Sequence, residues 1–231
     1  MRVPTLERMA RVIALPMLLL AAPAWAASSK SLDEAMSHDG LQRIKVKGVE
    51  LAYARPGATL AGYTRVKLDP VEVAFKKSWE PTRAGSNIKL SSTDRENIRT
   101  GVAQAVQEEF TRVLQDKNGY AVVDQPGPDV LRVKVNVVNL YVNAPEASAS
   151  MGRSRTYVVS AGEMTLFAEL IDSESGEVVA RVVDRREARN AGIVSLSGPG
   201  DSAAAVRAMA ADWARILRRA LDNARAMQAA R

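Results

Sequence analysis

The chain has 231 residues, of which 47% are hydrophobic and 25% are charged, a composition typical of globular proteins. It has no cysteine, which excludes disulfide frameworks, thiolate zinc sites, thiol catalysis and a lipid anchor on an N-terminal cysteine. Its one histidine, His38, excludes multi-histidine metal sites and disfavours a histidine-based catalytic triad. We therefore expect no metal and no cofactor.

The first 26 residues are typical of a secretory signal peptide. Three arginines precede an apolar stretch at residues 12–22, which is shorter than the roughly 20 residues needed to cross a bilayer. Ala24 and Ala26 form the small-x-small pattern of a cleavage site, so we expect cleavage before Ala27. The alternative is an uncleaved anchor. Cleavage predicts a mature protein in the periplasm or outside the cell.

The charge balance argues against a nucleic-acid partner. Removal of the signal peptide lowers the net charge from +6 to +4, because the leader contains three arginines and one glutamate. The remaining charges of both signs are interspersed along the chain. A nucleic-acid-binding protein is expected to concentrate Lys and Arg on one face, often with aromatic residues between them.

The mature chain begins with a polar segment, residues 27–45, that we expect to be flexible. Short strands are predicted at 46–54 and 63–75. The alternation of the second changes phase at Asp69-Pro70, and because proline has no N–H to donate, we expect a bulge or an edge position there. Four more strands are predicted, at 120–123, 130–142, 156–171 and 178–184.

Two features refine the later strands. Apolar and polar residues alternate in 130–142, which predicts one buried face and one face in water. The alternation changes phase after Val137, which predicts a second bulge. Asp172–Gly176 is expected to form a hairpin turn in which Gly176 can adopt a positive φ.

Two helices are predicted, at 94–116 and at about 201–227. Each has one apolar stripe with a spacing of three or four residues. Thr93 and Glu96 are expected to form the capping box of the first helix. Glu109 lies beside its apolar stripe. It is either a buried carboxylate that can act as an acid or base or, as we favour, a side chain at the edge of the stripe with its tip in water.

These elements predict a single α+β domain at residues 46–231. The helices and the long strands each have only one face to bury. We therefore expect an antiparallel-dominated sheet of about five strands with two amphipathic helices packed on one face. The strand–helix–strand unit around 94–116 is the one place where strands can pair in parallel.

The motifs predict no catalytic residue. The chain has no G-x-S-x-G elbow and no glycine-rich phosphate loop. Carboxylate chemistry needs two acidic groups across a cleft, and carboxylates are too common to single out such a pair. The hydrolase alternative would use residues such as Glu72 or Glu109.

The sequence supports a binding function slightly more than a catalytic one. Three arginines fall along one edge of the last predicted helix and could face an acidic partner or anionic lipid headgroups. Alternatively, these arginines only line a flank of the helix that is exposed to water. A small-residue loop and a polar loop supply the other candidates. The candidate partner-binding residues are Trp79, Met151, Arg153, Arg155, Arg207, Arg218 and Arg225.

Several segments share the pattern of one protein family. They are Tyr53–Gly57, Leu60–Tyr63, Val66–Phe75 followed by Trp79, Pro126–Leu131 and Leu170–Val178, within a match from about His38 to Leu221. This pattern resembles domain of unknown function 3313, a family of exported bacterial envelope proteins, many of them lipoproteins. The resemblance implies an envelope location and no reaction. The chain departs from the lipoproteins because alanine occupies the cleavage site.

We therefore expect an exported, non-catalytic protein that binds an envelope protein or the anionic envelope surface. The mature chain is expected to have no covalent lipid anchor and no transmembrane span. Two alternatives are a periplasmic carboxylate-dependent hydrolase and a subunit of a self-assembling envelope complex.

Overall fold

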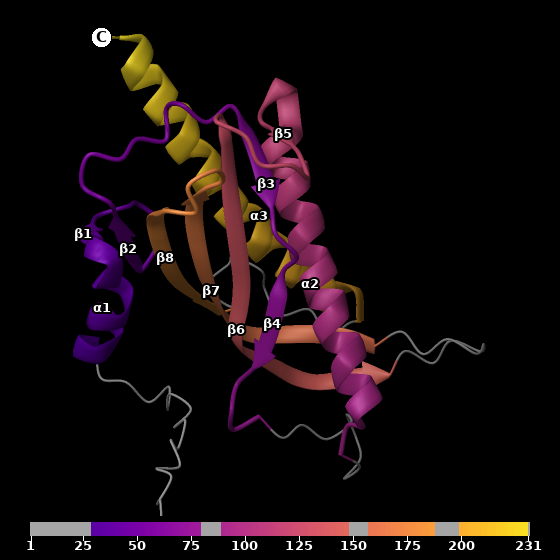
Figure 1. The fold of residues 1–231 in the computed structure, drawn as a ribbon. Helices are drawn as coiled ribbons and strands as arrows, with labels where there is room; N and C mark the ends of the chain where they lie inside the picture. The colour runs from indigo at the N-terminus through magenta and orange to yellow at the C-terminus, as the bar shows by residue number, and fades with distance from the viewer. Residues whose placement is uncertain (1–28, 80–88, 148–156, 188–198, 231) are drawn as a thin grey trace, which may run out of the picture.

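The computed structural model describes residues 29–79, 89–147, 157–187 and 199–230, which form one mixed eight-stranded sheet with three α-helices (Figure 1). The helices are α1 (Ser29–Ser37), α2 (Ser92–Gln115) and α3 (Pro199–Ala229), with 3-10 turns η1 (His38–Gly40) and η2 (Asp116–Asn118). The strands are β1 (Gln42–Ile44), β2 (Leu51–Ala54), β3 (Arg65–Leu68), β4 (Glu72–Phe75), β5 (Ala121–Val122), β6 (Val130–Ala147), β7 (Tyr157–Asp172) and β8 (Val178–Glu187).

The strand order is β1-β2-β8-β7-β6-β3-β5, and β4 pairs with β6 farther along the same edge as β3. β3 pairs in parallel with β5 and β6, and β4 pairs in parallel with β6. The remaining pairs are antiparallel. The predicted fold class, an antiparallel-dominated sheet of about five strands with two helices, is therefore wrong. The parallel pairs arise because α2 carries the chain back across the sheet, as a parallel connection requires.

The long antiparallel strands follow their sequence signals. In the turn between β7 and β8, the Asp172 carboxylate accepts a hydrogen bond from the backbone N–H of Ser175 at 2.8 Å. Gly176 adopts a φ of 72°, as a hairpin turn requires. The register of β6 shifts after Val138, and Asn139 takes a φ of 54°, so the predicted second bulge is present.

The predicted strand at 63–75 is divided into β3 and β4 at Asp69-Pro70. The Asp69 N–H donates to the Val133 carbonyl at 3.0 Å, and the Asp69 carboxylate pairs with Arg132 at 2.7 Å. Pro70 has no N–H with which to continue the ladder. The phase change in the sequence therefore marks the end of β3, which lies between β6 and β5, and the start of β4.

Helices α2 and α3 lie side by side on one face of the sheet and cover the main core (Figure 1). The helix cap differs from the prediction. The Ser91 hydroxyl accepts from the Asp94 N–H at 3.1 Å, and the Asp94 carboxylate accepts from the Ser91 N–H at 3.0 Å. The capping box therefore lies two residues before the predicted pair Thr93 and Glu96. Within the described ranges, no helix has the length and apolar character needed to span a membrane.

The opposite face of the sheet carries α1. Met36 and Leu41 pack against Tyr53 and Val183 in a second, smaller core. Segment 27–45 was expected to be flexible, but from residue 29 onward the structure places α1, η1 and β1 there. Met36 and Leu41 become buried only because the sheet provides an apolar surface beneath them.

Candidate functional site

A hollow of 330 Å³ lies where the C-terminal end of α2 meets the middle of α3. We call it the basic hollow. Its lining residues are Arg112, Val113, Asp116, Lys117, Arg215, Arg218, Arg219 and Asp222. Five basic side chains face two acidic ones, so the local potential is positive.

Contacts within the protein neutralise only part of this charge. Arg218 donates to the Val113 carbonyl at 2.8 Å and lies 3.8 Å from Asp222. Arg112 and Arg215 each pair with an acidic residue of their own helix, Glu109 and Asp212. Lys117 and Arg219 are exposed and have no ion-pair partner within the described ranges. These two cations are free to meet an external anion.

A second hollow, of 260 Å³, lies between the sheet and α3. We call it the apolar cavity. Its lining residues are Ile44, Val46, Val49, Ala52, Tyr53, Ala54, Ala58, Thr59, Leu60, Phe110, Val133, Leu166, Ala168, Leu170, Val179, Ala180, Val182, Trp213, Ile216, Leu217 and Ala220. All of these lie in the described part of the chain, and none is charged. Six are alanines, whose short side chains leave space that larger residues would fill.

Residues 44–49 form the outer wall of the apolar cavity. Gly48 has a φ of 92°, and a Cβ at this position would meet Ile216 Cδ1 on α3 at 3.2 Å. Arg186 holds the wall from the sheet side by donating to the Gly48 carbonyl at 3.3 Å. Ile44 is 43% exposed although it lines the cavity, so an apolar side chain stands at the rim.

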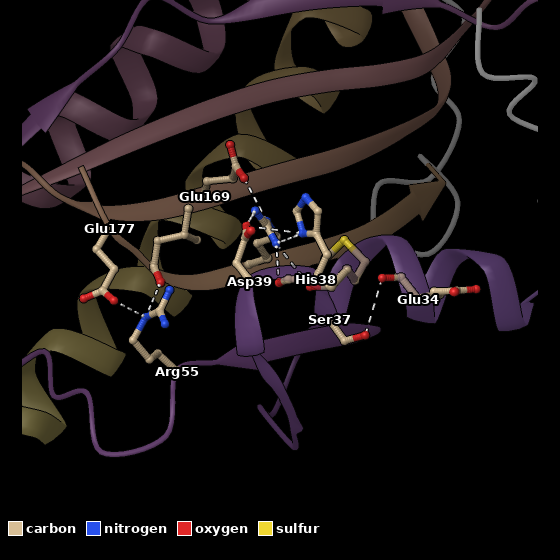
Figure 2. A network of polar contacts seen from close by, with 10 residues as sticks. Glu34, Ser37, His38, Asp39, Arg55, Glu169 and Glu177 are labelled. Carbon is tan, nitrogen blue, oxygen red and sulfur yellow. Dashed lines mark hydrogen bonds and ion pairs between the residues drawn. The ribbon is translucent and has the colours of Figure 1, made fainter. Parts of the chain in front are cut away.

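The opposite face carries a polar network around Arg181, a residue that is 4% exposed. Figure 2 labels its partners Glu169, His38 and Asp39. Arg181 pairs with Glu169 of β7 at 2.8 Å and with Asp39 of η1 at 2.6 Å. It also donates to the His38 carbonyl at 3.1 Å. The hydrogen bond from Arg181 lowers the pKa of Asp39. The network therefore ties the segment after α1 to the centre of the sheet.

The candidate arginines of the last predicted helix make contacts inside the protein. Arg207 pairs with Glu108 of α2 at 2.8 Å, and the Arg225 guanidinium lies 4.8 Å from the centre of the Tyr120 ring. Arg218 alone of the three lines the basic hollow. Trp79 is 8% exposed and stacks on Phe75, so it is a core residue in this structure.

Other predicted residues lie outside the described ranges. They are Ala24, Ala26 and Ala27 of the cleavage site and Met151, Arg153 and Arg155 of the loop. The two carboxylates of the hydrolase alternative are not brought together. Glu72 borders a hollow on the α1 face of the sheet, whereas Glu109 lies on α2 and pairs with Arg112 at 2.6 Å.

Four residues of the basic hollow were missed in the sequence: Arg112, Lys117, Arg215 and Arg219. The spacing of Arg215 and Arg219 puts both on one helix face and could have indicated a basic strip. Arg112 and Lys117 come from a different helix end, about 100 residues earlier in the chain. Only the packing of α2 on α3 joins the two pairs.

Comparison with known proteins gives the family. The profile of the family described as "Protein of unknown function (DUF3313)" matches residues 31–217. The chain belongs to this family, as the resemblance predicted. No curated protein is significantly similar to the chain.

Solved structures show distant likenesses. A PelC dodecamer from Paraburkholderia phytofirmans is 11% identical, with coverage of 72% of this chain and 98% of that one and a TM-score of 0.37. A DUF330 protein from Xanthomonas campestris is 13% identical, with coverage of 80% of this chain and 95% of that one and a TM-score of 0.35. Neither likeness carries an inference about what this chain does.

Proposed function

We propose that the chain is an exported, non-catalytic protein of the bacterial cell envelope that binds an anionic envelope surface through the basic hollow. The observation that supports this proposal is the gathering of five basic side chains from two helices around one depression. Lys117 and Arg219 supply the charge that internal partners leave available. The signal-peptide pattern at the N-terminus supports a location outside the cytosol for this surface.

The expected strength of this contact follows from its charge. A Lys or Arg close to an anionic membrane contributes about 1 kcal/mol, and the attraction falls off within a Debye length. Loss of the two free cations should therefore weaken binding by about 2 kcal/mol, which is about 30-fold. Binding through this surface should also weaken steeply as salt is added.

The test is co-sedimentation of the mature chain with vesicles of phosphatidylglycerol and phosphatidylcholine. The wild type should bind the phosphatidylglycerol vesicles and leave pure phosphatidylcholine vesicles unbound. Lys117→Glu with Arg219→Glu should reduce binding by at least about 30-fold. The matched control, Lys77→Glu with Arg95→Glu, changes the net charge equally at exposed sites away from the hollow and should keep most of the binding. Equal losses in both double variants would refute the assignment.

Export has a separate test. N-terminal sequencing of protein recovered from a periplasmic fraction should begin at Ala27. Recovery from the cytosol with Met1 intact would contradict the proposal. Turnover of ester or glycoside substrates by the purified chain would contradict the non-catalytic part of it.

A further inference from the structure

The apolar cavity is a separate site on the same molecule, at a different face of α3. Apart from the outer wall and residues 58–60, its lining side chains come from four adjacent strands, β2, β8, β7 and β6, and from α3 and Phe110 of α2 above them. Four strands span about 14 Å, because neighbouring strands lie about 4.8 Å apart. The hollow therefore extends across the sheet instead of forming a round void.

The shape selects the kind of occupant. A volume of 260 Å³ spread over about 14 Å makes an elongated hollow that fits one unbranched hydrocarbon chain. At about 30 Å³ for each methylene, the size of a water molecule, the cavity holds about nine methylenes. An apolar lining of this kind does not hold water.

The polar end of such a ligand must remain outside, because no lining residue carries a charge. The outer wall offers a place for it. Lys45 and Lys47 are exposed on the wall segment, and neither has an ion-pair partner among the residues that the structure describes. They alternate with Ile44 and Val46, which line the cavity. An anionic headgroup at the rim would therefore lie near two cations.

We propose that the apolar cavity binds the single acyl chain of an anionic monoacyl amphiphile, with the chain between the sheet and α3 and the headgroup at the wall. The six lining alanines provide the space for the chain. Trp213 lines the cavity and reports on its contents. The site is independent of the basic hollow.

The test uses the mature chain and saturated fatty acids from hexanoate to tetradecanoate, with calorimetry as the readout. The dissociation constant should fall about fourfold for each added methylene until the cavity is full near ten carbons, and then level off. A bromine on the terminal carbon of decanoate should quench Trp213 in a Trp79→Phe chain. Methyl decanoate, which lacks the charge, should bind more weakly than decanoate, and Lys45→Ala with Lys47→Ala should remove this difference.

Two variants fill the cavity from opposite sides. Ala220→Leu on α3 and Ala180→Leu on β8 should each weaken decanoate binding by at least tenfold. The matched control is Ala208→Leu, which makes the same change at a half-buried position of α3 outside the cavity lining and should leave binding unchanged. The double variant of the basic hollow should also bind decanoate normally. Absent binding, affinity that does not depend on chain length, or wild-type affinity in both Ala220→Leu and Ala180→Leu would overturn the proposal.

Discussion

Replacement of Arg181 by Met tests how firmly the segment after α1 is attached to the sheet (Figure 2). Methionine keeps most of the aliphatic packing and removes the charge. The Glu169 side chain, only 18% exposed, loses its buried partner, and the carbonyl of His38 loses a donor. Breaking a buried ion pair from one side costs about 3–5 kcal/mol. Because Asp39 and His38 are about half exposed and can turn to water, we expect a loss near the lower limit, about 3 kcal/mol.

The matched control is Arg185→Met. Arg185 lies four residues along the same strand, on the same face, and pairs with Glu163 at 2.8 Å, but its side chain is 51% exposed. An exposed pair contributes up to about 1 kcal/mol. A loss of 3 kcal/mol should lower the unfolding temperature by about 6–12 °C in a chain of this size.

Two measurements decide this prediction. Urea unfolding gives the free energy of each variant, and hydrogen exchange reports whether residues 33–41 lose protection. We expect the loss of protection in Arg181→Met alone. The reasoning is refuted if Arg181→Met and Arg185→Met destabilise the protein equally, or if hydrogen exchange in this segment does not change.

Two further outcomes follow from buried polar groups. The Asp184 carboxylate accepts from the Trp213 indole N–H at 2.7 Å and from the Glu50 backbone N–H at 3.0 Å, so Asp184→Ala should cost about 3 kcal/mol in urea unfolding. Asp212, whose side chain is 42% exposed, is the control, and Asp212→Ala should cost under about 1 kcal/mol. Equal costs would contradict this prediction. Burial, with the hydrogen bond to Asp172, raises the pKa of Tyr63 to about 12. Below pH 10 this tyrosine is neutral whether folded or unfolded, so its stabilising effect is complete there and is lost as the pH rises from 10 through 12. Tyr63→Phe should therefore make the alkaline decline of unfolding free energy shallower, and an unchanged slope would exclude this role.

Local patterns in the sequence were sufficient for the elements with strong periodicity. The apolar stripe of residues 98–113 predicted α2, and its members are buried as expected. The Asp172–Gly176 turn and the bulge after Val137 were also predicted, because each depends on residues within a few positions of one another.

Weak or short segments were harder to predict. β1 and α1 are brief, and their side chains bury little surface until a partner is in place. Residues 27–45 were expected to be flexible because the segment is polar, and Met36 and Leu41 were not singled out. Their burial depends on Tyr53 and Val183, which follow later in the chain.

From the sequence alone came the family, the two long helices, the strongest hairpin and the export pattern at the N-terminus. Tertiary structure decided the order of the strands, the parallel pairing of β3 and β4 with β6, and both hollows. The physical reason is range: a helix stripe or a tight turn is set by neighbours in the chain, whereas the basic hollow needs Lys117 and Arg219 together. Residues that far apart acquire a common role only when α2 packs against α3.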